Sequence, residues 1–196
     1  MAVIKNKKII LGIDPGTIYT GYCILEIINQ KNVNIVDYNL IKASGKASLN
    51  ERIKYIISIL KKIIQEYKPK ELSLETAYYG KNPQSVLKLG RLQGAIIALS
   101  LLNNIRIYEY SPKRVKQLIT GNGNASKYQV FKTINSFFNN ICLDLKKNSK
   151  YDVSDAIAIA LSHYISTNNF TTNQFNKLEV SHYKSWKDYL IKKGLL

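Results

Sequence analysis

Apolar residues in the first quarter of the chain form three runs that are typical of β-strands. The runs cover residues 8–14, 19–27 and 33–43, and the third alternates partly between apolar and polar positions. A Pro-Gly turn separates the first two runs. The short connections predict an antiparallel meander.

A helical pattern follows the meander. Ser48 and Glu51 match a capping box, with the Ser at the N-cap and the Glu at the third helical position. Apolar residues then recur at helical spacing from Leu49 to Tyr67, and Pro69 stops the pattern. The sequence therefore predicts an amphipathic helix over residues 49–67.

The rest of the chain alternates between strand and helix patterns. Strands are predicted at residues 71–76 and 105–110, and helices at 82–102, 112–119, 126–139 and 152–166. This order predicts an α/β fold, a mixed five-stranded sheet with helices on both faces. Residues 1–166 are expected to form one domain, and the polar, Asn-rich segment 167–196 an extension of unknown role.

The charge of the chain favours a polyanionic partner. Lys and Arg number 29 against 13 acids, the net charge is +16, and 45% of the residues are hydrophobic. A basic, globular protein of this kind is expected to bind nucleic acid. Lys, Asn, Ile and Tyr all have A/T-rich codons, so nucleotide bias is an alternative source of the lysines.

The two cysteines, Cys23 and Cys142, have no metal-ligand spacing, which favours a reducing cytoplasm. The longest strongly apolar stretch, residues 95–102, is shorter than the roughly 20 residues that cross a bilayer. Asp14 interrupts the first apolar run, which is too short for a signal peptide. We expect a soluble, cytoplasmic protein without a membrane partner.

Four carboxylates carry the candidate chemistry. Asp14 and Glu75 end apolar strand runs, and Asp152 and Asp155 lie three residues apart at the start of an Ala/Ile-rich helix. A sheet and a helix can bring such acids together around Mg²⁺, which prefers oxygen ligands. Two metal ions about 3.5–4 Å apart can activate water and stabilise the leaving oxygen in phosphodiester hydrolysis. The pattern is that of a metal-dependent nuclease.

Each acid also has a structural alternative. Asp14 could form a turn before Pro-Gly, and Glu75 could be a strand-end charge. Asp152 could be a helix N-cap, and Asp155 an acid that compensates the helix dipole. His163 lies about 16 Å along the helix from Asp152 and is expected to be a packing or surface residue.

Several motifs occur in the order seen in the bacterial RuvC family of Holliday junction resolvases, which the chain resembles over roughly residues 8–165. They are residues 10–16 (ILGIDPG), 20–22 (TGY), Glu75 with Tyr78 and 81–82 (KN), 87–90 (LKLG), 115–117 (VKQ), Gly121 with Gly123, Lys127 with Val130, and 152–160 (DVSDAIAIA). The resemblance implies a ribonuclease H-like fold and a homodimer. It also implies Mg²⁺-dependent resolution of four-way DNA junctions by paired symmetric nicks in recombination and repair. A branch-migration motor of the RuvA and RuvB type is a candidate partner.

The resemblance also implies roles for single residues. Asp14, Glu75, Asp152 and Asp155 would hold two Mg²⁺ ions per active site, with Mn²⁺ as a substitute, and Lys127 would lie nearest the scissile phosphate. The implied DNA contacts are Tyr78, Tyr79, Lys81, Asn82, Lys88, Arg91, Lys116 and Lys127. One of the two tyrosines would stack at the opened junction centre, and which one is left open. Solvated lysines and a tyrosine in the core are the alternatives.

Small residues recur every four positions in the predicted helix 82–102, at Gly90, Gly94 and Ala98. Each Gly costs about 1 kcal/mol relative to Ala in a helix, so a close contact should compensate. Packing on the protein's own sheet and a dimer contact both fit, and the resemblance favours a two-fold interface.

Three other functions remain to be distinguished. The run 13–17 (IDPGT) is also similar to a phosphate motif of actin-like ATPases, although 196 residues cannot supply their second phosphate-binding half. A small RNA-processing nuclease of the same fold would share the acids. A noncatalytic nucleic-acid binder would need none of them.

Overall fold

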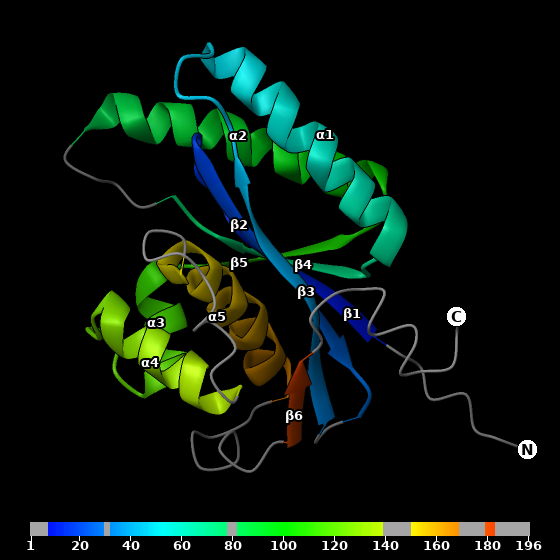
Figure 1. The fold of residues 1–196 in the computed structure, drawn as a ribbon, viewed down its shortest axis with the longest axis vertical. Coiled ribbons are helices and arrows are strands. Elements are labelled where there is room, and N and C mark those ends of the chain that lie inside the picture. The colour runs from blue at the N-terminus through cyan, green and yellow to red at the C-terminus, as the bar shows by residue number, and fades with distance from the viewer. Residues whose placement is uncertain (1–7, 30–31, 78–81, 139–149, 169–178, 183–196) are drawn as a thin grey trace, which may run out of the picture.

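The computed structural model describes residues 8–29, 32–77, 82–138, 150–168 and 179–182 (Figure 1). Six strands form one sheet in the order β5-β4-β1-β2-β3-β6. The strands are β1 (Lys8–Asp14), β2 (Tyr19–Ile27), β3 (Asn32–Lys42), β4 (Glu71–Glu75), β5 (Arg106–Tyr110) and β6 (Glu179–His182). β1, β2 and β3 form the predicted antiparallel meander, while β4 is parallel to β1 and β5 is parallel to β4. The predicted mixed sheet is confirmed.

Helices cover both faces of this sheet, as predicted. In the described part of the chain they are α1 (Leu49–Tyr67), α2 (Pro83–Leu102), α3 (Pro112–Thr120), α4 (Lys127–Phe137) and α5 (Lys150–Thr167). Figure 1 shows α1 and α2 on one face and α3, α4 and α5 on the other. Ile10 packs into the core below α5, whereas its neighbour Leu11 packs into the core below α1. Because both faces of β1 are buried, its apolar residues run continuously and do not alternate.

Local signals placed most element ends correctly. The Ser48–Glu51 capping box is present, and a second one joins Ser126 to Gln129 at the start of α4. Differences are small: α4 ends at Phe137, before the predicted Asn139, and α5 begins at Lys150. Asp152 therefore lies inside the first turn of α5, and the N-cap alternative for this residue is wrong.

Small residues let α5 approach the sheet closely. A Cβ atom added to Gly12 of β1 would lie 2.6 Å from the Ala160 Cβ and 2.7 Å from the Ala156 carbonyl oxygen. A Cβ atom on Gly21 of β2 would collide with the Asp152 carbonyl oxygen. Larger side chains at these glycines would push α5 outward, so the glycines of motifs 10–16 and 20–22 and the alanines of motif 152–160 set the position of α5 over the sheet.

The sixth strand was not predicted. β6 pairs in parallel with β3, from Asn32 opposite Glu179 to Ile35 opposite His182. The prediction of five strands is therefore incomplete, because part of segment 167–196 extends the sheet. The four residues of β6 include only one apolar side chain, so periodicity could not indicate a strand there.

Candidate active site

The four predicted acids converge at one end of the sheet. Asp14 ends β1 and Glu75 ends β4, two neighbouring parallel strands that pair up to Ile13 and Leu74. Carboxylate oxygens of Asp14, Asp152 and Asp155 lie within 4.8 Å of one another. Asp14, Asp155 and Glu75 line one cavity of about 230 Å³. We call these four residues the acid cluster.

Burial and mutual repulsion raise the pKa of three carboxylates of the acid cluster. Burial, then the charges of Glu75 and Asp155, raise the pKa of Asp14 well above its ordinary value. Burial and the charge of Asp155 raise the pKa of Glu75 to about 7. Burial also raises the pKa of Asp155, against the opposing effect of Lys127. Crowded, partly desolvated carboxylate oxygens of this kind fit a hard divalent cation such as Mg²⁺.

Two lysines face the acid cluster from α3 and α4. The Lys127 ammonium lies 2.8 Å from an Asp155 carboxylate oxygen, and Lys116 lines the same cavity. Burial lowers the pKa of Lys127, but the hydrogen bond to Asp155 and the nearby acids raise it above its ordinary value overall. Lys127 is the first residue of α4, so the Ser126 cap fixes the backbone from which it extends. Lys127 and Lys116 therefore lie beside the acids, and their roles toward DNA stay predictions.

The turn after Asp14 is held by Thr20, a residue without a predicted role. Its hydroxyl donates to the Gly16 carbonyl oxygen at 2.7 Å and accepts from the Gly16 N–H at 3.3 Å. A Cβ atom on Gly16 would collide with the Tyr19 carbonyl oxygen. Thr20 and Gly16 thus close the turn on which Asp14 sits, and the matching motif at residues 20–22 was the available signal.

The predicted DNA contacts are only partly described. Tyr78, Tyr79 and Lys81 lie outside the described residues. The Asn82 side chain caps α2 by accepting from the N–H groups of Gln84 and Ser85. Lys88 and Arg91 are exposed on α2. The DNA-binding roles of all these residues stay predictions.

The strip formed by Gly90, Gly94 and Ala98 faces outward. All three residues are exposed, and a Cβ atom on either glycine would meet nothing within 4 Å among the described residues beyond its own helix. Because the strip is exposed, the alternative that it packs on the protein's own sheet is wrong.

By length and composition α2 is the one helix among the described residues that could cross a membrane, although the longest strongly apolar stretch was expected to be too short.

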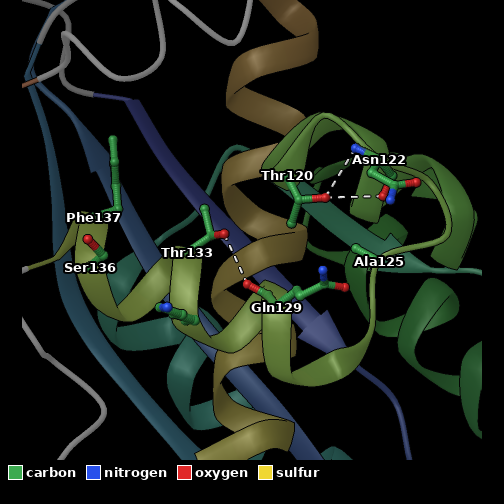
Figure 2. A pocket seen from close by; sticks show the side chains of 8 residues that line it. Thr120, Asn122, Ala125, Gln129, Thr133, Ser136 and Phe137 are labelled. Carbon is green, nitrogen blue, oxygen red and sulfur yellow. Dashed lines mark hydrogen bonds between the residues drawn. The ribbon is translucent and has the colours of Figure 1, made fainter.

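A second cavity, of about 460 Å³, lies between the 121–125 loop and α4 (Figure 2). The described residues that line it include no carboxylate. Several of its polar groups are already bound locally: the Thr120 hydroxyl donates to the Lys116 carbonyl, and the Thr133 hydroxyl donates to the Gln129 carbonyl. The smaller cavity with the acid cluster is therefore the candidate active site.

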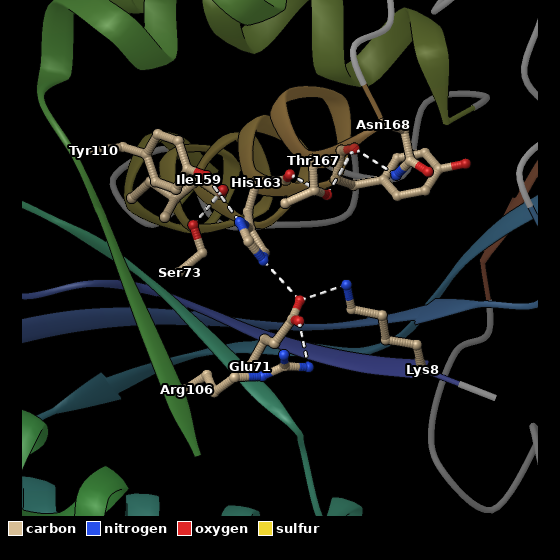
Figure 3. A network of polar contacts seen from close by, with 10 residues as sticks. Lys8, Glu71, Ser73, Arg106, Tyr110, Ile159, His163, Thr167 and Asn168 are labelled. Carbon is tan, nitrogen blue, oxygen red and sulfur yellow. Dashed lines mark hydrogen bonds and ion pairs between the residues drawn. The ribbon is translucent and has the colours of Figure 1, made fainter. Parts of the chain in front are cut away.

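Another buried carboxylate, Glu71, lies at the opposite end of β4 (Figure 3). Its oxygens lie 2.6 Å from Lys8 Nζ, 3.1 Å from Arg106 Nη2 and 2.7 Å from His163 Nε2. Although burial raises it, hydrogen bonds from Lys8 and His163 hold the pKa of Glu71 below its ordinary value. We call these residues, with Tyr110, the Glu71 network.

His163 is fully buried in this network, and burial lowers its pKa. These partners fit a neutral imidazole that donates from Nε2 to Glu71 and accepts from the Tyr110 hydroxyl at Nδ1, 2.8 Å away. The expectation that His163 packs a helix is confirmed.

The sheet, the flanking helices and the acids at the ends of β1 and β4 define a ribonuclease H-like nuclease. The model of the family "Crossover junction endodeoxyribonuclease RuvC" matches residues 10–163. The chain therefore belongs to the RuvC family of crossover junction endodeoxyribonucleases, as the resemblance implied.

Individual relatives agree with this assignment. A RuvC from Chloroherpeton thalassium is 42% identical over 183 residues, which cover 93% of this chain and 95% of the relative. A RuvC from Prosthecochloris aestuarii is 44% identical over 154 residues, which cover 78% of this chain and 79% of the relative.

Solved structures show the same fold. Thermus thermophilus RuvC in complex with a Holliday junction substrate superposes with a TM-score of 0.73 at 22% identity, over 83% of this chain and 96% of that one. The yeast mitochondrial Holliday junction resolvase Ydc2 gives a TM-score of 0.61 at 17% identity, over 89% of this chain and 81% of that one.

Proposed function

We propose that the protein is a Mg²⁺-dependent endodeoxyribonuclease that resolves four-way DNA junctions by paired symmetric nicks. The observation that carries the proposal is the convergence of Asp14, Asp152 and Asp155 within 4.8 Å, beside Glu75, in a chain of the RuvC family. Recombination and repair are the processes that produce such junctions. A reducing cytoplasm is the proposed location.

In this proposal the acid cluster holds the metal. Two bound Mg²⁺ ions, or Mn²⁺ in their place, would supply an activated water and stabilise the leaving oxygen. Asp14, Glu75, Asp152 and Asp155 provide the oxygen ligands. Lys127 stands at the rim, 65% exposed, and offsets negative charge that develops on the scissile phosphate. Val115 and Val130 form an apolar wall of the cavity.

The same surface binds the DNA backbone. Lys116 lines the cavity beside the acids, and a basic chain of net charge +16 attracts phosphate over a wide area. The proposed contacts outside the cavity are Tyr78, Tyr79, Lys81, Asn82, Lys88 and Arg91. One tyrosine of the pair stacks on unpaired bases at the junction centre.

The active species is a homodimer that pairs through α2. The side chains of Leu87, Leu101 and Leu102 are exposed by 59%, 60% and 83%, next to the small-residue strip. An apolar, uncovered helix favours a partner surface, and a two-fold junction cut on two strands requires two active sites related by the same symmetry. A motor of the RuvA and RuvB type stays a predicted partner.

The decisive experiment compares an immobile four-way junction with a linear duplex of the same sequence. Purified protein should nick two opposed junction strands at symmetric positions when Mg²⁺ is present, and should leave the linear duplex intact. Binding without metal-dependent cleavage would support the noncatalytic alternative. Preferred cleavage of structured RNA would support an RNA-processing nuclease.

Dimerisation through α2 is tested by Gly94→Leu. The glycine has open space around it, so Leu should leave the monomer folded but obstruct a close helix contact. Gly45→Leu is the matched control, because Gly45 also has open space and lies away from α2. Light scattering should show a monomer for Gly94→Leu and a dimer for Gly45→Leu, with paired cleavage lost only in the former. A dimeric, fully active Gly94→Leu protein would place the interface elsewhere.

A further inference from the structure

Gln93 is a buried polar residue on the inner side of α2, with only 8% of its surface exposed. Its carboxamide Nε2 donates a hydrogen bond to the backbone carbonyl oxygen of Glu75 at 2.6 Å. The two residues are 18 positions apart, so this bond joins a helix to the end of a strand. Neither the acid motifs nor the resemblance singled out Gln93.

The bond acts at the point where the pairing of β4 with β1 has ended. The ladder between β4 and β1 runs from Ile10 opposite Glu71 to Ile13 opposite Leu74, so Glu75 lies one residue beyond it. On the other side β5 still holds the chain, through Tyr110 opposite Glu75 and the Thr76 N–H bond to the Tyr110 carbonyl. The Gln93 amide supplies a further tie to the Glu75 backbone.

We propose that Gln93 is a positioning residue for the metal site: its amide holds the Glu75 backbone so that the Glu75 carboxylate stays with Asp14 and Asp155. This inference rests on the proposed function, because it takes Glu75 as a metal ligand. Partners that orient a metal ligand commonly change metal affinity about 10–100-fold when they are lost.

The location of Gln93 gives this bond a second consequence. Gly94, the next residue, belongs to the exposed small-residue strip on the outer side of α2. The helix that is proposed to meet the second protomer therefore also holds the backbone of an active-site acid on its inner side. A shift of α2 on dimerisation would reach Glu75 through a single hydrogen bond.

Gln93→Met tests the inference, because Met is similar in length but has no N–H donor. Ser100→Ala is the matched control: Ser100 is also buried on α2, but its hydroxyl donates to Ile96 of the same helix at 2.9 Å. Mn²⁺ binding is measured by calorimetry without DNA, beside the Mg²⁺ dependence of junction cleavage, junction affinity without metal and thermal unfolding.

We expect Gln93→Met to weaken Mn²⁺ binding about 10-fold or more and to raise the Mg²⁺ concentration for half-maximal cleavage by a similar factor. Junction affinity without metal should match the wild type. Ser100→Ala should bind Mn²⁺ normally. If Gln93→Met does not fold, Gln93→Leu replaces it, since Leu is neutral, also lacks an N–H donor and adds no charge beside the metal site.

Two results separate failure of this inference from failure of the proposed function. Wild-type Mn²⁺ affinity in folded Gln93→Met or Gln93→Leu protein, with cleavage still lost in Glu75→Gln, overturns the positioning role alone. A loss of Mn²⁺ affinity in Ser100→Ala equal to that in Gln93→Met also overturns it, because the effect would then come from general loosening of α2. Full cleavage in Glu75→Gln would refute the metal site itself.

Discussion

Glu71 and Glu75 lie at the two ends of β4 and meet opposite electrostatic environments. Glu71 is surrounded by Lys8, Arg106 and His163, and its pKa is lowered. Glu75 shares its cavity with Asp14 and Asp155, and its pKa is raised to about 7. One strand of five residues thus carries a neutralised carboxylate at its start and a repelled one at its end.

The difference separates a structural acid from a functional one. The charge of a buried carboxylate with cationic partners is compensated inside the fold. Removing one partner would leave an uncompensated buried charge and destabilise the protein. Several partly buried carboxylates that repel one another destabilise the fold, and such an arrangement indicates a site that a cation completes.

The largest expected contrast is in catalysis. Asp14→Asn or Glu75→Gln should lower the rate of junction cleavage by more than about 100-fold. Loss of a metal ligand should reduce activity more than loss of a residue that only orients a ligand, which costs about 10–100-fold. Glu71→Gln should cleave at a rate close to that of the wild type. Junction binding should persist in all three, since each substitution removes negative charge. Single-turnover cleavage and gel-shift assays measure both, and wild-type rates in Asp14→Asn would refute the assignment.

The second contrast is in stability, and its sign differs between the two regions. Glu71→Gln should lower the free energy of unfolding by about 1–3 kcal/mol, since charged donors lose their acceptor. Asp14→Asn should raise the stability of the metal-free protein, because it relieves repulsion among the acids. Urea unfolding in EDTA measures both changes. A destabilised Asp14→Asn protein would show that the acid cluster is not strained.

The contributions of Glu75 and Glu71 to stability should depend on pH in opposite senses. The folded-state pKa of Glu75 is about 7, above its ordinary value of 4.5, so the folded protein binds the extra proton and loses stability as pH rises from about 4.5 to 7. The lowered pKa of Glu71 acts in the opposite sense, with a contribution present above pH 4.5 and lost in more acidic solution. Glu75→Gln should therefore flatten the fall in stability of metal-free protein between pH 5 and 7. An unchanged slope would argue against a raised Glu75 pKa.

The smallest expected effect distinguishes the lysines of the two regions. Lys116→Ala should weaken junction binding and reduce the slope of log affinity against log salt by roughly one, because one phosphate contact is lost. Lys8→Ala should leave that slope unchanged and lower stability instead, since Lys8 neutralises Glu71. Binding titrations at several salt concentrations measure the slopes. Equal slopes for Lys116→Ala and the wild type would reject the phosphate role.

Contacts between distant segments limited what could be predicted for the site. Asp14, Glu75, Asp152 and Asp155 were recognisable from strand ends, helix spacing and family motifs, but their separations depend on how closely α5 packs on Gly12 and Gly21. The bond between Gln93 and Glu75 spans 18 residues, and that between His163 and Glu71 spans 92. No pattern of neighbouring residues specifies such pairs.

Features that arise between residues close along the chain could be predicted from sequence: the strands of the meander, the capping box at Ser48, the helix end before Pro69 and the acids at element ends. These depend on backbone preferences and on side chains within about four positions of one another. The folded structure was needed to show that β6 extends the sheet beside β3, that the α2 strip faces outward, and that β4 carries one neutralised and one repelled carboxylate. Those outcomes depend on charges and surfaces that meet only after distant elements pack, because electrostatic and packing energies follow distance in space rather than along the chain.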